Sequence, residues 1–339
     1  MGNYDKYICT TLEKIHLQPG PTPDEKKMLA KEGWRLRMEN ILWLDADILP
    51  GGYYGEAAWI WPETYANQIT QDILDTRTTP NAPMFPHYHE YPELLSWWGT
   101  DPDNFDDTTE MKMIMGDEEI HLKGSWVCYA PARMYHMPMG VKGGYVTPRP
   151  QYHWTSGPGM YTRDKAEDAS ADDSVGEVPV PGSPRKSTTE NRKYFVMGGD
   201  QKECPVKIDY MPEIDSRYCR HVAYVDENII PGAEFGCNTK YLLPGFPKES
   251  GMVVMEPHTL SYGTTITMSA MNYDDLYNLD AEVELWIGGE KHLINKRFGA
   301  YVPPGVEQGP LIVRNMKKQI FFLTSGPVGE GIKKYPGGS

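Results

Sequence analysis

The sequence predicts an all-β protein that contains two tandem copies of one small antiparallel barrel or sandwich. Three observations predict this fold: the chain repeats itself, each copy consists of short β-rich runs, and 29 prolines and 33 glycines interrupt those runs. Long helices should therefore be few. The length of 339 residues also favours two domains, because single cores usually stop growing at about 250 to 300 residues.

The repeat is visible when the chain is compared with itself. ILWLDADILPGG matches VAYVDENIIPGA with an offset of 181 residues, which pairs Asp45 with Asp226. Further on the offset is 172 and pairs Pro131 with Pro303, so the first copy is interpreted as nine residues longer. We place these extra residues in the acidic loop GTDPDNFDDTTE. The copies end on the similar words WTSGP and LTSGP.

Short runs such as WVCYA, TTITMSA and QIFFLT, separated by Gly, Pro, Asn and Asp, are typical of strands joined by turns. A polar, acidic stretch between the copies cannot bury its own surface and is predicted to be a flexible linker or lid. An N-terminal arm should contribute one short helix packed on the outside of the first barrel. The predicted organisation is an arm (1–37), a first barrel (38–163), a linker (164–193) and a second barrel (194–339).

Composition excludes several classes of function. The formal net charge of -14 opposes binding to nucleic acid or to anionic lipid surfaces. No apolar run is long enough to span a membrane, and the first residues show no secretion signal, which predicts a cytoplasmic protein. Five widely spaced cysteines are an odd number and argue against a disulfide framework.

Two of only nine histidines stand in HYHEYPE, as His87 and His89, with Glu93 four residues after the second. On a strand, residues i and i+2 point to the same face, so both imidazoles can aim at one point inside a barrel. Glu93 can fold back as an oxygen ligand, and His136 in YAPARMYHMP can supply a third imidazole. These four side chains are predicted to bind one divalent transition metal.

Three neutral imidazoles and one carboxylate suit Fe, Mn, Co, Ni, Cu or Zn and leave coordination positions open for substrate or water. An open site of this kind is typical of catalytic metal centres. The sequence alone does not choose among the metals.

Both motifs resemble those of the cupin superfamily. HYHEYPE followed by Gly99 resembles the first cupin motif, and Gly124, Pro131 and His136 resemble the second. The first motif lacks its opening Gly, and Ala and Arg follow Pro131 where the family has small turn residues. The resemblance covers both repeats and implies two tandem jelly-roll β-barrels with a short N-terminal helical arm.

The second copy provides an internal control for the metal prediction. Offsets of 181 and 172 place Met268, Ala270, Asp274 and Gln308 opposite His87, His89, Glu93 and His136. A thioether, a methyl, a carboxylate and an amide cannot compete for a first-row divalent ion. The second barrel is therefore predicted to be metal-free and to serve as scaffold or as a homodimer surface.

Three further residues are candidates for chemistry on the substrate. His153 corresponds to Phe322 in the second copy, so a polar residue occurs only in the metal-binding copy, which makes His153 a candidate acid, base or hydrogen-bond donor. Tyr135 and Arg133 flank His136 and could bind a substrate carboxylate or stabilise an oxyanion.

The predicted substrate is a small oxygenated molecule, such as an organic acid, enol or phenol, that chelates the metal through two oxygens. With Fe(II), the resemblance to cupin dioxygenases implies oxidative C–C cleavage, which we favour. With Mn, Zn or Ni the resemblance implies a redox-neutral lyase, decarboxylase or isomerase. A non-enzymatic bicupin that binds a small ligand is the remaining alternative.

Overall fold

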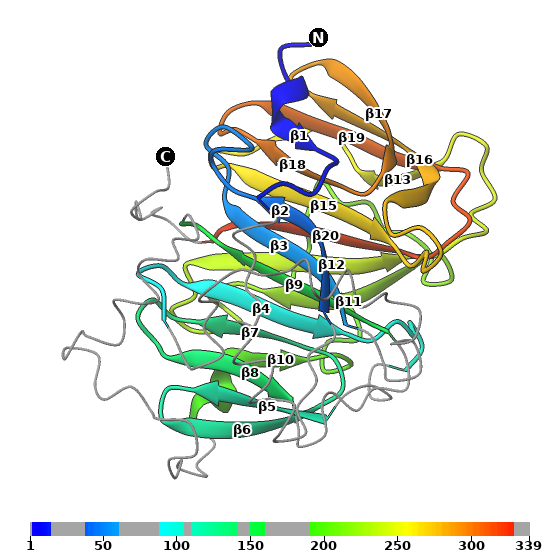
Figure 1. Ribbon diagram of the computed structural model, residues 1–339. Helices are drawn as coiled ribbons and strands as arrows, with labels where there is room; N and C mark the ends of the chain where they lie inside the picture. The colour runs from blue at the N-terminus through cyan, green and yellow to red at the C-terminus, as the bar shows by residue number, and fades with distance from the viewer. Residues whose placement is uncertain are drawn as a thin grey trace. The chain divides into compact units, whose positions relative to one another are not determined.

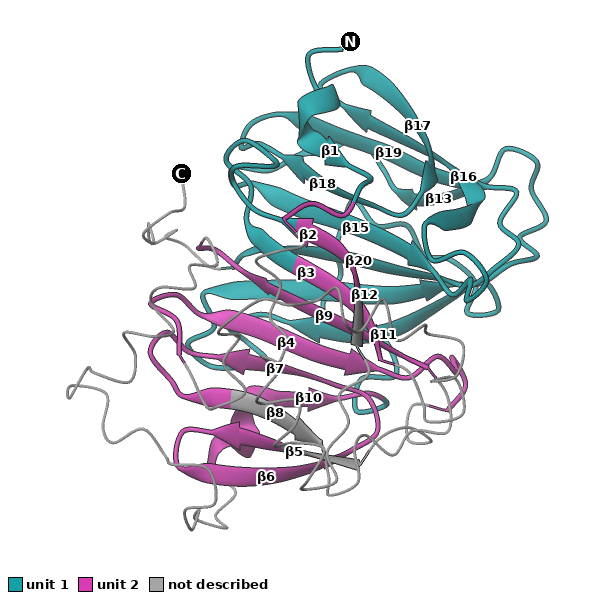
Figure 2. Cartoon of the chain, viewed as in Figure 1, with its two compact units in different colours: residues 1–11, 44–55, 199–339 teal, residues 12–43, 56–198 magenta. Residues whose placement is uncertain are grey.

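The computed structural model describes residues 2–14, 38–60, 88–104, 110–140, 150–159 and 190–328, and these are almost entirely β-strands and turns. The chain divides into two compact units (Figure 2). Unit 1 contains Met1–Thr11, Leu44–Gly55 and Gly199–Ser339, and unit 2 contains Leu12–Trp43 and Glu56–Gly198. Within the described residues, no helix has the length and apolar character needed to cross a membrane.

Unit 2 holds most of the first sequence repeat. Its six-stranded sheet has the order β10-β7-β4-β9-β3-β2, and a three-stranded sheet has the order β6-β5-β8 (Figure 1). The strands of the larger sheet are β2 (Met38–Leu44), β3 (Tyr54–Ile60), β4 (Glu93–Trp98), β7 (Trp126–Ala130), β9 (Gln151–Gly157) and β10 (Phe195–Met197). Those of the smaller sheet are β5 (Glu110–Met115), β6 (Glu118–Lys123) and β8 (His136–Gly140).

Unit 1 holds most of the second repeat. Its six-stranded sheet has the order β1-β18-β15-β20-β12-β11, and its five-stranded sheet consists of β13-β19-β16-β17 with β14 paired to β19. The larger sheet contains β1 (Ile8–Cys9), β11 (Cys219–Val225), β12 (Phe235–Leu242), β15 (Thr264–Ala270), β18 (Phe298–Val302) and β20 (Ile320–Pro327). The smaller sheet contains β13 (Met252–Met255), β14 (His258–Thr259), β16 (Asn278–Ile287), β17 (Glu290–Lys296) and β19 (Glu307–Arg314).

The two large sheets have the same strand order, so the predicted duplication and the all-β tandem fold are confirmed. Equivalent turns support the offset of 181 residues in the first part of each copy. The Asp45 carboxylate accepts hydrogen bonds from the backbone N–H groups of residues 47 and 48 at 3.0 and 3.2 Å. Asp226 does the same for residues 228 and 229 at 2.8 and 3.1 Å. Each aspartate thus closes the turn that follows the first strand of its copy.

The N-terminal arm differs from its prediction. Residues Asp5–Tyr7 form the 3-10 helix η1, and β1 pairs with β18 in unit 1, whereas the arm was expected on the first barrel. The strand β10 takes the equivalent place beside β7 in unit 2. Each short strand covers a backbone edge that would otherwise lack hydrogen-bond partners. The predicted helix of the arm lies outside the described residues, as does most of the predicted linker, whose last residues begin the 3-10 helix η6 (Glu190–Tyr194).

Strand register corrects the alignment of the two copies around the metal motif. Leu94 pairs with Ser156 in unit 2, and Thr265 pairs with Ser325 in unit 1, where both serines belong to the shared TSGP word. Leu94 therefore corresponds to Thr265, and the offset in this region is 171. Glu93 accordingly corresponds to Thr264, not to Asp274.

The same offset continues upstream. The N–H of Arg133 donates to the carbonyl oxygen of His89 at 2.7 Å, and the N–H of Gly305 donates to that of Leu260 at 2.8 Å. His89 thus corresponds to Leu260, and in the sequence His87 corresponds to His258. The assignments of Met268 and Ala270 were wrong, because the insertion that changes the offset precedes β4 and does not lie in the acidic loop.

The prediction for the remaining ligand is correct. His136 pairs with Met115, the residue before Gly116, and Gln308 pairs with Ile287, the residue before Gly288. Both glycines have a positive φ, so the two ladders are equivalent. The second copy therefore keeps one histidine of the motif and has Leu260, Thr264 and Gln308 at the other three positions.

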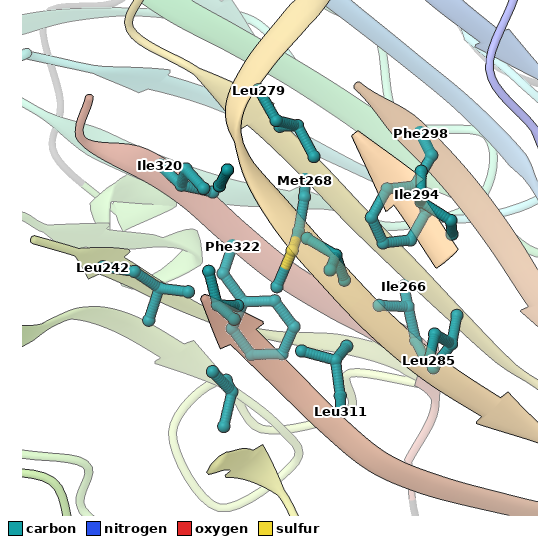
Figure 3. Packing of buried hydrophobic residues seen from close by; sticks show 14 of the residues in the cluster. Leu242, Ile266, Met268, Leu279, Leu285, Ile294, Phe298, Leu311, Ile320 and Phe322 are labelled. Carbon is teal, nitrogen blue, oxygen red and sulfur yellow. The ribbon is translucent and has the colours of Figure 1, made fainter. Parts of the chain in front are cut away.

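The interiors of the two barrels differ in character. In unit 1 both sheets contribute apolar side chains, and Met268, Phe322, Leu311 and Ile266 lie packed together (Figure 3). In unit 2, Trp97 occupies the position of Met268 and His153 that of Phe322. The first barrel thus places polar and aromatic groups where the second has a tightly packed apolar core.

Candidate metal centre

The candidate metal centre lies at the end of the unit 2 barrel where β4 and β8 begin. Glu93 is the first residue of β4 and alternates with Leu95 and Trp97, both of which belong to the buried core, so its carboxylate points inward. His136 begins β8 and pairs with Met115, another core residue, and therefore faces the same interior.

His89 reaches the centre from the turn before β4. Its carbonyl oxygen is held by the N–H of Arg133, and its ring stacks on that of Tyr91 with centroids 5.0 Å apart and an interplanar angle of 10°. The imidazole is therefore oriented by backbone and ring contacts rather than by a strand.

Side-chain atoms of His89, Glu93 and His136 come within 4.8 Å of one another, and all three residues are buried. Glu93 Oε2 lies 2.8 Å from His136 Nε2 and 3.4 Å from His89 Nε2. Two ligands about 2.1 Å from one ion, at a right angle, are about 3 Å apart. The spacing of these three atoms therefore fits one small divalent cation.

A hydrogen bond to the backbone orients His136 for this role. Its Nδ1 lies 2.8 Å from the carbonyl oxygen of Met134, a contact that assigns the proton to Nδ1. Nε2, the other ring nitrogen, lies 2.8 Å from Glu93 Oε2 and is the nitrogen that would bind a metal. Metal-binding histidines commonly donate their other ring N–H to a carbonyl or carboxylate in this way.

The surroundings of Glu93 favour its ionised form. Burial opposes ionisation, but the imidazoles of His89 and His136 outweigh burial and hold the pKa of Glu93 well below its usual range. Glu93 Oε1 accepts a hydrogen bond of 2.7 Å from the hydroxyl of Thr155. The carboxylate therefore directs Oε2, and not Oε1, toward the two imidazoles.

The sequence interpretation overlooked Thr155, although a signal for it exists. Thr155 lies two residues beyond His153 on β9 and pairs with Leu95, so both side chains face the barrel interior. Applying the strand alternation to His153 would have identified Thr155 as a neighbour of the site.

We expect the Thr155→Val variant to bind divalent metal about tenfold more weakly, because residues that orient ligands usually contribute 10- to 100-fold to metal affinity. Valine keeps the shape of threonine and removes only the donor to Glu93 Oε1. A competition titration against a chromogenic chelator measures the affinity. Thr155→Ser should restore it, and equal affinities for all three proteins would show that Thr155 does not orient the carboxylate.

His153 lies deeper in the same barrel. Its Nδ1 is 2.8 Å from the carbonyl oxygen of Ser96, and its ring centroid is 4.1 Å from that of Trp97. Burial lowers the pKa of His153 to about 4, although the Ser96 carbonyl and Glu93 act in the opposite direction. The imidazole is thus neutral near pH 7, with Nε2 as the nitrogen that can accept a proton.

Arg133 and Tyr135 lie next to the centre, around Tyr88. The guanidinium carbon of exposed Arg133 is 5.8 Å from the Tyr88 ring centroid, and the ring of Tyr135 meets the same ring edge-on at 5.3 Å. Arg133 has a φ of 66°, a conformation that favours glycine, and its counterpart in unit 1 is Gly305. An arginine therefore stands at a strained turn that the second copy fills with glycine.

His87 and Cys128 are two further residues to consider as ligands. His87, the fourth ligand predicted from the sequence, lies outside the described residues. Cys128 is buried nearby, and burial, followed by the charge of Glu93, holds the pKa of its thiol well above the usual range. A protonated thiol is a weak metal ligand, so Cys128 is not part of the proposed ligand set.

No protein family profile matches the chain, and no curated protein is similar to it in sequence. Solved structures are similar in fold. AerE from Microcystis aeruginosa is 12% identical, with 86% of this chain and 92% of that chain covered and a TM-score of 0.42. The structure itself shows that each unit has a six-stranded and a smaller antiparallel sheet.

Two oxalate decarboxylases are also similar in fold. A variant of the Bacillus subtilis enzyme is 10% identical, with 88% of this chain and 76% of that chain covered and a TM-score of 0.46. The formate complex of the Lactobacillus farciminis enzyme is 11% identical, with 87% and 84% covered and a TM-score of 0.45. The likeness concerns the fold, and the site is interpreted from its own residues.

Proposed function

We propose that the unit 2 barrel is the active site of a metal-dependent enzyme that acts on a small organic acid with two metal-chelating oxygens. The convergence of His89 Nε2, His136 Nε2 and Glu93 Oε2 in a buried place carries this proposal. All three atoms are of the kinds that bind first-row divalent metals, and their spacing fits one ion. The three ligands among the described residues leave coordination positions for the substrate.

The metal would act as a Lewis acid that polarises the substrate oxygens it binds. Arg133 would pair with a carboxylate of the substrate, because its guanidinium is exposed beside the turn that holds His89. His153 would take up a proton at Nε2, because its Nδ1–H is engaged by Ser96. Tyr135 is proposed only to hold Tyr88, and through it Arg133, in place.

Two reaction classes fit this arrangement. Oxidative C–C cleavage with O2, a dioxygenase reaction, is our first proposal, and it requires iron as the metal. A redox-neutral decarboxylase, lyase or isomerase is the second, and His153 favours it because a neutral buried imidazole is a ready general base. Manganese, zinc or nickel would suit the second class.

The test begins with protein purified without added metal, whose metal content is measured and which is then stripped and reconstituted with each of Fe(II), Mn, Zn and Ni. A panel of small dicarboxylates, 2-oxo acids and catechols is assayed with and without O2. Turnover that needs iron and consumes O2 supports a dioxygenase, and turnover without O2 supports the redox-neutral class. Metal-loaded protein that turns over no member of the panel would favour a non-enzymatic binder.

Arg133→Gly is expected to have opposite effects on stability and on catalysis. Removing the side chain relieves the positive φ, which should stabilise the fold by about 1 kcal/mol. The KM for an anionic substrate should rise at least about tenfold, because one charge-assisted contact is lost. Urea denaturation and steady-state kinetics measure the two effects. An unchanged KM would remove Arg133 from the substrate site, and Arg133→Lys should show an intermediate KM.

A further inference from the structure

The barrel of unit 1 carries its own polar cluster at the end that corresponds to the metal centre of unit 2. Thr264 holds the position of Glu93, and Gln308 that of His136, as the strand registers show. Thr264 alternates with the core residue Ile266, and Gln308 pairs with the core residue Ile287, so both side chains face the interior.

Thr264 and Gln308 each bury one side-chain polar atom that has no hydrogen-bond partner among the described residues. Their exposed fractions are 6% and 1%, and neither Thr264 Oγ1 nor Gln308 Oε1 has a hydrogen-bond partner among the described residues. A buried polar atom left without a partner costs about 1 to 3 kcal/mol. Such atoms are retained in folded proteins mainly where a ligand or ordered water binds them.

His258 adds a nitrogen acceptor to the same cluster. It pairs with Gln308 across the ladder between β14 and β19, so the two side chains are neighbours. Its Nδ1 lies 2.8 Å from the carbonyl oxygen of Glu256, which assigns the proton to Nδ1 and the lone pair to Nε2. Nε2 is buried without a partner among the described residues, and the ring is stacked on Tyr210 with centroids 3.5 Å apart.

Asn238 supplies a further acceptor on β12. It alternates with the core residue Leu242, and its exposed fraction is 3%. Its Nδ2 donates to the sulfur of Met211 at 3.0 Å, while Oδ1 has no hydrogen-bond partner within the described chain. The cluster thus offers three acceptors and one hydroxyl that can donate or accept.

The chemistry of this cluster selects its ligand. None of the four side chains carries a formal charge, since burial lowers the pKa of His258 and keeps its ring neutral. Lone pairs on three acceptors repel an anion. Lys240 lies two residues after Asn238 on β12 and pairs with His221, whose pKa its positive charge helps to lower. The same positive charge disfavours a bound cation. The remaining class is an uncharged molecule with several O–H donors.

We propose that the end of the unit 1 barrel formed by Thr264, Gln308, His258 and Asn238 binds a small uncharged polyol or sugar. Met268 and Phe322 belong to the packed apolar core of the same barrel (Figure 3), so the ligand would bind at the barrel end. This site is separate from the proposed catalytic centre and does not depend on it.

The test uses the full-length protein and titration calorimetry with glycerol, myo-inositol and D-glucose, and with D-gluconate as the charged counterpart of glucose. At least one of the three neutral probes should bind, and gluconate should bind at least tenfold more weakly than glucose. The variants Thr264→Val and Gln308→Leu keep the side-chain shape and remove the polar atoms. Each should weaken binding of the neutral probe at least tenfold.

Urea denaturation without ligand distinguishes a loss of binding from a loss of folding in the two variants. Both variants should unfold at the same or a higher urea concentration than the wild type without ligand, because each removes an unsatisfied buried atom. His136→Ala in unit 2 should leave polyol binding unchanged. No heat with any neutral probe on the wild type, or equal binding by Thr264→Val and Gln308→Leu, would overturn the proposal and leave ordered water as the occupant.

Discussion

His136→Ala and Glu93→Gln are each expected to lower the affinity for divalent metal by more than about 100-fold and to abolish turnover. Replacing residues that only orient ligands already costs 10- to 100-fold, and these two changes remove the imidazole or the carboxylate whose atoms lie 2.8 Å apart at the centre. Elemental analysis of protein after dialysis should show about one equivalent of metal in the wild type and none in either variant.

Glu93→Gln should be less stable than the wild type both with and without metal. Metal at 1,000 times its dissociation constant stabilises the wild type by about 4 kcal/mol, and the variant loses this contribution. Without metal, the neutral amide loses the attraction of the carboxylate to His89 and His136, which holds the pKa of Glu93 low and stabilises the folded state. Thermal unfolding with and without a chelator measures both differences.

His121→Ala is the matched control for the histidine variant. The His121 side chain is exposed on β6 and contacts Glu119 at 3.0 Å, so its removal should change neither metal content nor turnover. If His136→Ala kept a full equivalent of metal while His121→Ala lost it, the proposed centre would be wrong.

The duplicated architecture could be predicted from the sequence because its signals are local. The aspartate turns at Asp45 and Asp226 and the TSGP words recur at fixed positions, and strand alternation is written in short apolar runs. The pairing of the edge strand β1 with β18 and of β10 with β7 could not be predicted, because strands of two or three residues are too short to show which strand they pair with.

The positions of the predicted ligand residues follow from the sequence where a strand places them, and less well where the two copies had to be aligned. Glu93 and His136 meet as expected, since both begin strands that face one interior. The counterpart of Glu93 was missed because an insertion before β4 shifts the register, and only the ladder with TSGP reveals Thr264. PHYHEY and PHTLSY are similar words that could have revealed the offset of 171.

Two features around the site, the hydrogen bond to Glu93 and the strained turn at Arg133, could not be predicted from the sequence. The hydrogen bond from Thr155 to Glu93 needs two strands in register, and the positive φ of Arg133 follows from the turn that holds His89. Neither feature corresponds to a fixed spacing of residues along the sequence. Both arise from the ladder between distant segments.

His153→Phe is expected to make the metal-free protein less sensitive to acid. The folded pKa of His153 is about 4, below the value of about 6.5 in an unfolded chain, so the folded state binds fewer protons between these values. The neutral His153 therefore contributes fully to the free energy of unfolding of the wild type above pH 6.5, and this contribution is lost as the pH falls toward 4. The shift corresponds to about 3 kcal/mol. Phenylalanine occupies the equivalent position of the second copy, as Phe322.

Urea denaturation of both proteins in a chelator, from pH 7.5 to pH 4, measures the effect. The stability of His153→Phe relative to the wild type should rise by about 3 kcal/mol across this range. His221 in unit 1 also has a pKa of about 4, because of burial and then Lys240, and its contribution cancels in the difference between the two proteins. A difference that does not change with pH would mean that His153 is not held neutral by burial. If His153 is also the base, the variant should keep its metal and lose turnover by at least 100-fold.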